Sequence, residues 1–165
     1  MRVRVALPLI LLVAGAAASM AVGAAPRDDA LKPLSVRLGG EGQAALLRGD
    51  ASAAIDAFEA ALASDPRNVG AFTGLAHSYE KLGLPGKAVR FYREALLINP
   101  SDLAALEGQG KALIARGATA RAQINLARIK ALCKADCPEA KRLQTAIAAA
   151  ATASAAPAKP ATARN

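Results

Sequence analysis

The chain has 165 residues, of which 53% are hydrophobic, 3% aromatic and 21% charged, and its formal net charge is +8. One His and two Cys exclude a multi-histidine metal site and leave little material for a nucleophile–base pair. Alanine is abundant and period-two apolar runs are absent, which argues against an all-β fold. We therefore expect one small domain of closely packed helices, with no enzymatic site, no metal and no cofactor.

The first 24 residues have the pattern of a secretory signal peptide. Arg2 and Arg4 precede an apolar segment, residues 5–13, and small residues then provide a cleavage position after Ala24. The uncharged segment 5–25 is also long enough to span a bilayer, so a retained anchor is the alternative. Both interpretations place the remaining chain on the exported side. We expect a bacterial periplasm, with a protein anchored to the inner membrane and facing the periplasm as the alternative.

Three consecutive segments, residues 35–68, 69–102 and 103–136, align without a gap at a period of 34. In the middle segment apolar residues recur at the i, i+3, i+4, i+7 spacing of a helix, and Gly83 with Pro85 predicts a turn into a second helix. The spacing therefore predicts helix pairs that stack one upon the next. The defining residues are Phe72, Leu75, Ala76, Tyr79, Gly83, Ala88, Tyr92, Ala95 and Pro100.

These residues resemble the tetratricopeptide repeat, with Phe72 and Ala76 where that motif usually has Trp and Gly. The resemblance implies an all-α fold, an α-solenoid of three tandem helix-turn-helix repeats with a C-terminal capping helix over residues 138–150. A generic Ala-rich helical bundle is the alternative. Residues 25–34 are expected to be a linker, and residues 151–165 a disordered tail rich in Ala, Pro and Thr.

In families of stacked helix pairs the first helices line a concave groove that binds a peptide or a helix of a partner. Some tetratricopeptide proteins hold the C-terminal carboxylate of heat-shock chaperones through Lys, Asn and Arg. This chain has only Gly, Ala or Gln at the matching positions, so that function is not carried over. The resemblance places these residues in the groove: Val36, Gly39, Gln43, Leu46, Thr73, His77, Glu80, Glu107, Lys111 and Ile114.

The function that we expect is therefore an exported, non-enzymatic adaptor that binds a segment of another envelope protein in this groove. Three alternatives stay open. The small groove residues can serve tight packing alone, with no ligand. The chain can be a membrane-anchored assembly subunit that keeps its N-terminal helix. It can also be a thiol-redox protein that uses its two cysteines.

Cys133 and Cys137 lie four residues apart, and in an exported protein this spacing predicts a structural disulfide. The pair stands where the first two repeats use Asp65-Pro66 and Asn99-Pro100 to end the second helix. Two thiolates would leave a tetrahedral metal ion two ligands short, so we expect no metal site here.

The charge is unevenly distributed along the sequence. Residues 25–110 carry nine basic and eleven acidic side chains, whereas residues 111–165 carry ten basic and two acidic ones. This basic C-terminal end suits an acidic partner or anionic lipid headgroups, and the alternative is a solvated face that maintains solubility. No aromatic stacking platform accompanies the charge, so nucleic acid is not an expected partner.

Overall fold

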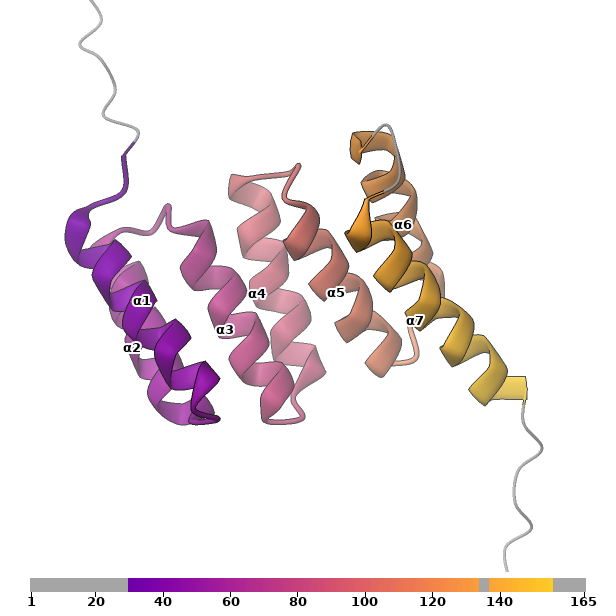
Figure 1. Cartoon of the computed structure of the whole chain (residues 1–165), viewed down its shortest axis with the longest axis horizontal. Helices are drawn as coiled ribbons and strands as arrows, with labels where there is room; N and C mark the ends of the chain where they lie inside the picture. The colour runs from indigo at the N-terminus through magenta and orange to yellow at the C-terminus, as the bar shows by residue number, and fades with distance from the viewer. Residues whose placement is uncertain (1–29, 134–136, 156–165) are drawn as a thin grey trace, which may run out of the picture.

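The computed structural model describes residues 30–133 and 137–155. Every regular element among these residues is a helix, and consecutive helices pair and stack along the molecule (Figure 1). The predicted all-α solenoid is confirmed, with a seventh helix against the last pair. The helices are α1 (Pro33–Leu47), α2 (Ala51–Ser64), α3 (Val69–Lys81), α4 (Pro85–Ile98), α5 (Leu103–Ala115), α6 (Thr119–Cys133) and α7 (Pro138–Ala155).

The same turn joins the two helices of every pair. Its glycine has a positive φ, 82° at Gly49, 70° at Gly83 and 74° at Gly117. A Cβ disfavours this conformation, and the backbone then folds back on the helix that has just ended, as in the 2.8 Å bond from Leu84 N to Tyr79 O. Because the glycines are 34 residues apart, the turn confirms the period found in the sequence.

The second helix of the first pair, and the first helices of the next two pairs, begin with a capping side chain. Asp50 and Asp102 accept hydrogen bonds at 2.9 Å from backbone N–H groups three residues further on, and Asn68 does so at 3.0 Å. Each cap satisfies an N–H group that has no partner within its own helix. Caps and glycine turns therefore fix the helix boundaries from local sequence alone.

Aromatic rings fill the space between successive pairs, and glycines make room for them. Phe58 on α2 is 2% exposed and lies against Gly42 and Gly74, where a Cβ at Gly42 would stand 2.8 Å from the ring. Tyr92 on α4, fully buried, meets Gly108 in the same way. Helices that approach so closely leave these rings just beneath the surface formed by α1, α3 and α5.

The first helix of each pair lies on the inner, concave side. Neighbouring first helices contact one another, from α1 to α3, α5 and α7, whereas within residues 30–133 the second helices α2, α4 and α6 do not. A stack whose first helices are closer together than its second helices curves towards the first helices. The helix α7 occupies the place that the first helix of a fourth pair would take.

Two predicted boundaries are wrong. The helix α1 begins at Pro33, inside the predicted linker 25–34, because proline fits the first position of a helix. The helix α7 continues to Ala155, past the predicted end at residue 150 and into the predicted disordered tail, because alanine is the strongest helix former. The predicted signal peptide and residues 156–165 lie outside the described residues. In the part that the structure covers, no helix has the length and apolar character needed to cross a bilayer.

Candidate functional site

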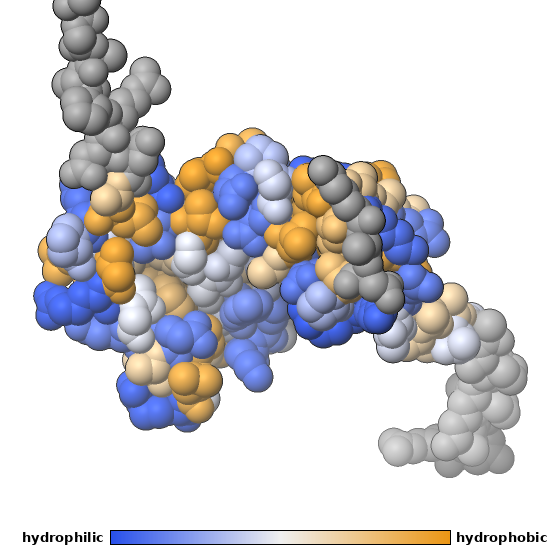
Figure 2. Space-filling model, turned by 45° about the horizontal axis from the view of Figure 1, so that its top comes forward, coloured by the Kyte–Doolittle hydropathy of each residue, from blue (hydrophilic) through white to orange (hydrophobic). Residues whose placement is uncertain are grey.

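The concave surface carries two neighbouring pockets, and Figure 2 shows the surface around them as a mosaic of hydrophilic and hydrophobic areas. The apolar pocket, of about 250 Å³, is lined by Leu31, Val36, Gly39, Gln43, Phe58, Asn68, Gly70 and Ala71. The polar pocket, of about 290 Å³, is lined by His77, Glu80, Tyr92, Ala104, Glu107, Gly108, Lys111 and Arg142.

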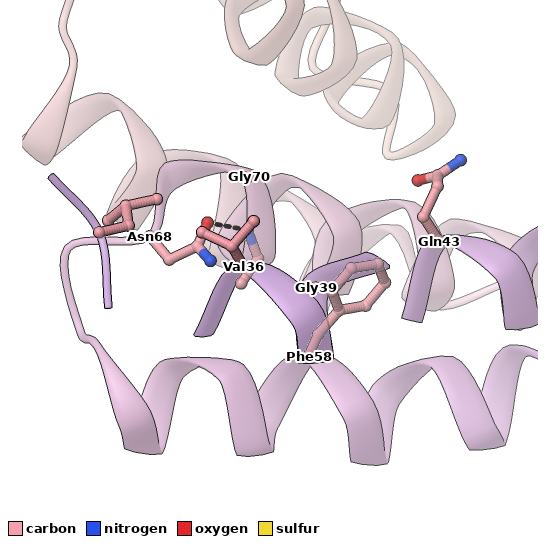
Figure 3. Close-up of a pocket in the computed structure, with 8 residues that line it drawn as sticks. Val36, Gly39, Gln43, Phe58, Asn68 and Gly70 are labelled. Carbon is pink, nitrogen blue, oxygen red and sulfur yellow. Dashed lines mark hydrogen bonds between the residues drawn. The ribbon is translucent and has the colours of Figure 1, made fainter. Parts of the chain in front are cut away.

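The apolar pocket lies between α1 and α3, with the ring of Phe58 from α2 beneath Gly39 (Figure 3). The glycines at its walls leave the space that a side chain would fill. Asn68, the polar residue at one end, donates to Ser35 Oγ at 2.9 Å and accepts from Ala71 N at 3.0 Å, so its amide is already satisfied. Gln43 extends away from the ring, and the pocket therefore suits a small apolar group.

The polar pocket contains a second aromatic floor with a polar tip. The hydroxyl of Tyr92 donates to Glu80 Oε2 at 3.0 Å, and the His77 ring stands edge-on to Tyr92 at 5.6 Å. Burial raises the pKa of Glu80 and of Tyr92. Burial, together with the nearby charge of Lys111, lowers the pKa of His77. At neutral pH the pocket thus presents a neutral imidazole and a protonated phenol beside the Glu80 carboxylate.

A buried ion cluster forms the far wall of the polar pocket. Glu107 is 6% exposed, and its carboxylate accepts from Lys111 Nζ at 2.5 Å and from Arg142 Nε and Nη2 at 2.8 and 2.6 Å. Although burial raises the pKa of Glu107, hydrogen bonds from Arg142 and Lys111 hold it below its ordinary value. The two cations are therefore already occupied by a carboxylate of the chain itself.

Arg142 reaches Glu107 from α7, so the capping helix supplies part of the site. The 34-residue register explains why an arginine fits there. Gly74 and Gly108 make room for Phe58 and Tyr92, and Arg142 follows in the same column. In the last pair the ring position is held by Leu126, which is smaller and leaves space for a guanidinium. Extending the column into the capping helix is the signal that could have found this residue.

Seven of the ten residues predicted for the groove line a pocket. Val36, Gly39 and Gln43 line the apolar pocket, and His77, Glu80, Glu107 and Lys111 line the polar one. Leu46 and Ile114 pack against the core, and Thr73 donates to Gly70 O at 2.9 Å; none of these three lines either pocket. Sequence reasoning missed Phe58, Asn68, Tyr92 and Arg142.

One expectation needs correction. Nothing in the sequence marked Glu107 as buried, yet its carboxylate is enclosed by Lys111 and Arg142 and is not presented to a partner. The physical reason is the contact with α7, which covers this part of α5.

The described residues show neither a nucleophile–base pair at His77 nor a metal cluster. The neighbouring Ser78 is buried and donates to Gly74 O at 2.9 Å, within its own helix. Within residues 30–133 and 137–155, no three His, Cys, Asp or Glu side chains gather as a metal site would require. The Sγ atoms of Cys133 and Cys137 lie 2.00 Å apart, which is bonding distance, and connect the end of α6 to the start of α7.

A family profile described as tetratricopeptide repeat matches residues 45–109, which span the first turn to the middle of α5. The chain belongs to the tetratricopeptide repeat family. No curated protein matches the sequence. Among solved structures, the tetratricopeptide domain of Sgt2 from Aspergillus fumigatus superimposes with a TM-score of 0.69 at 26% identity, covering 86% of this chain and 95% of that one.

Two further structures share the fold of this tetratricopeptide chain. The first such domain of Spaghetti (RPAP3), bound to the HSP90 peptide SRMEEVD, has a TM-score of 0.65 at 23% identity and covers 72% of this chain and 96% of that one. An O-GlcNAc transferase mutant from Thermobaculum terrenum has a TM-score of 0.62 at 23% identity. It covers 71% of this chain but 22% of that one, so the repeats form a small part of that protein.

Proposed function

We propose that the chain is an exported, non-enzymatic adaptor that holds a peptide or a helix of an envelope partner in its concave groove. The observation that carries the proposal is the pair of pockets along α1, α3 and α5, each with an aromatic floor exposed by missing side chains. A groove with two separate pockets on rigid helices suits a segment that places one side chain in each. The Spaghetti domain, which shares the fold, is bound to a peptide.

The charges of the polar pocket restrict the segment that it would accept. Lys111 and Arg142 already pair with Glu107, so an acidic side chain would have to compete with a buried carboxylate. The acidic HSP90 peptide of the Spaghetti structure is therefore a poor candidate ligand for this chain. We expect a segment with an apolar side chain for the apolar pocket and a neutral hydrogen-bonding group for the polar one.

Photo-cross-linking in the native host tests the groove. A photoreactive residue replaces Val36 or His77, one in each pocket, and Glu59 on the outer side of α2 provides an exposed control position. We expect the same discrete adduct from both groove positions and none from the control. Adducts from the control alone, or no adduct at any position, would contradict a groove ligand.

The alternatives differ in what happens at the two ends of the chain. A membrane-anchored assembly subunit would retain residues 1–24, and the mass of the protein isolated from its host distinguishes it from a cleaved adaptor. A thiol-redox protein would cycle the Cys133–Cys137 pair at the reduction potential of its compartment, whereas a structural disulfide would resist reduction there.

A further inference from the structure

The outer side of the last two pairs differs from the rest of the molecule. We call it the convex ridge. Leu97 is 70% exposed and Ile124 is 61% exposed, and the ridge residues recur along their helices at three- and four-residue spacing, on the side turned away from the groove. It comprises Lys87, Arg90, Leu97 and Ile98 on α4 and Arg121, Ile124, Arg128 and Leu132 on α6.

Three of the four ridge cations are positioned by groups that leave their charge uncompensated. Lys87 Nζ lies 4.7 Å from the ring centre of Tyr79, and the guanidinium of Arg90 lies 5.3 Å from that of Phe91. Arg128 donates to the carbonyl of Pro100 at 3.0 Å. Aromatic faces and carbonyls orient a cation without cancelling its charge for a distant partner.

Acidic side chains are scarce on the same two helices. Glu94 is the one acidic residue of α4, and it pairs with Arg93, which is not part of the ridge, at 3.6 Å. The sequence of α6 contains none. The convex ridge therefore combines an uncompensated positive charge with four exposed aliphatic side chains.

The outer side of α2 provides an internal comparison, because the repeat register aligns it with the ridge. The position of Arg90 and Ile124 is taken there by Asp56, and that of Leu97 by Ala63. The exposed charges of α2 are Asp56 and Glu59. The basic and aliphatic character is thus a property of α4 and α6 and not of second helices in general.

We propose that the convex ridge docks on the surface of an anionic lipid bilayer. Basic side chains are attracted to anionic headgroups, and aliphatic side chains between them enter the boundary of the acyl region. Cations separate the four aliphatic residues, and isolated side chains of this kind need no complementary pocket in a bilayer, whereas a protein partner would have to supply one. This function is additional to the groove, which stays open on the opposite side.

The absence of Trp from the sequence allows a site-specific test on the full-length protein. The variant Ile124→Trp places the single indole on the ridge, and Ala60→Trp places it on the exposed side of α2 as the matched control. Each variant is mixed with vesicles of phosphatidylcholine alone and with vesicles of equal parts phosphatidylcholine and phosphatidylglycerol. Because the signal comes from one position, membrane binding by residues 1–24 does not itself shift the ridge fluorescence.

We expect a blue shift for Ile124→Trp with the anionic vesicles only, lost at high salt, and no shift for Ala60→Trp. Adding Arg90→Glu and Arg121→Glu to Ile124→Trp should weaken binding at least about twentyfold. Adding Arg37→Glu and Arg48→Glu on α1 instead changes the net charge equally and should have little effect.

Three results would overturn the proposal. The first is an Ile124→Trp spectrum that anionic vesicles leave unchanged while far-ultraviolet circular dichroism shows a folded helical protein. The second is an equal shift with neutral vesicles, or an equal effect of the two pairs of charge reversals, because the ridge would then not recognise anionic lipid. The third is loss of an acidic protein partner from the Arg90→Glu, Arg121→Glu variant without any vesicle effect.

Discussion

The two pockets of the groove are built on the same backbone and differ in chemistry. In the first pair Phe58 and Leu46 form an apolar contact, and in the second pair the register replaces them with Tyr92 and Glu80, which are joined by a 3.0 Å hydrogen bond. In the third pair the same positions return to aliphatic side chains. Repetition therefore conserves the position of a contact while single substitutions decide whether it is greasy or polar.

The largest expected effect separates the two pockets. Phe58→Ala removes a ring that is 2% exposed and lies between two glycines, so it should lower the free energy of unfolding by about 3–5 kcal/mol. Urea denaturation measures the loss, and Phe58→Leu should recover part of it. A loss below about 1 kcal/mol would show that α1 and α3 close over the gap.

The cysteine pair is expected to act through α7, and so on the polar pocket alone. Replacing Cys133 and Cys137 with Ser should cost about 2 kcal/mol, the value for so short a covalent loop. Unfolding of the original protein in reductant should match that of the double variant, which should itself not respond to reductant. If reductant leaves both proteins equally stable, the pair does not secure the capping helix.

The hydroxyl of Tyr92 tests what the polar contact contributes. Tyr92→Phe leaves the half-buried Glu80 without its donor and should cost about 1–2 kcal/mol. Adding Glu80→Leu restores the apolar pairing of the first repeat and should recover most of that loss. The double-mutant cycle measures the coupling, and additive losses would mean that the two side chains act independently.

The smallest expected effect is on the pH dependence of stability. Burial lowers the pKa of His77 from 6.5, so the stability that it contributes is present above pH 6.5 and is lost as the pH falls through the folded value. Lys111 and Lys81 reinforce this shift and Glu107 opposes it. Thermal unfolding below pH 6.5 should therefore decline more steeply in the original protein than in His77→Gln. Parallel curves would place His77 in a solvent-like environment.

The sequence predicts local features well because they depend on local chemistry. Gly83 and its equivalents predict the turns, and the apolar spacing around Phe72 and Tyr79 predicts the helix pairs, since each depends on residues within one repeat. The columns of the register also place most of the groove residues correctly.

Contacts that depend on the fit between distant helices could not be predicted in the same way. The bond from Arg142 to Glu107 joins residues on α7 and α5, and it requires that Leu126 be too small to fill the space. The burial of Glu107 follows from that contact. The extent of α7 was misjudged because a composition typical of a disordered tail also favours a helix once one end is docked.

The glycine turns at residues 49, 83 and 117 have a consequence for how such a protein can change length. Each turn is closed within its own repeat, so a block of 34 residues is a transferable unit with matching ends. A duplication of residues 69–102 would lengthen the groove by one step and give it a second Tyr–Glu contact without disturbing the first. A chain of this design can therefore acquire a longer binding surface through one in-frame copying event.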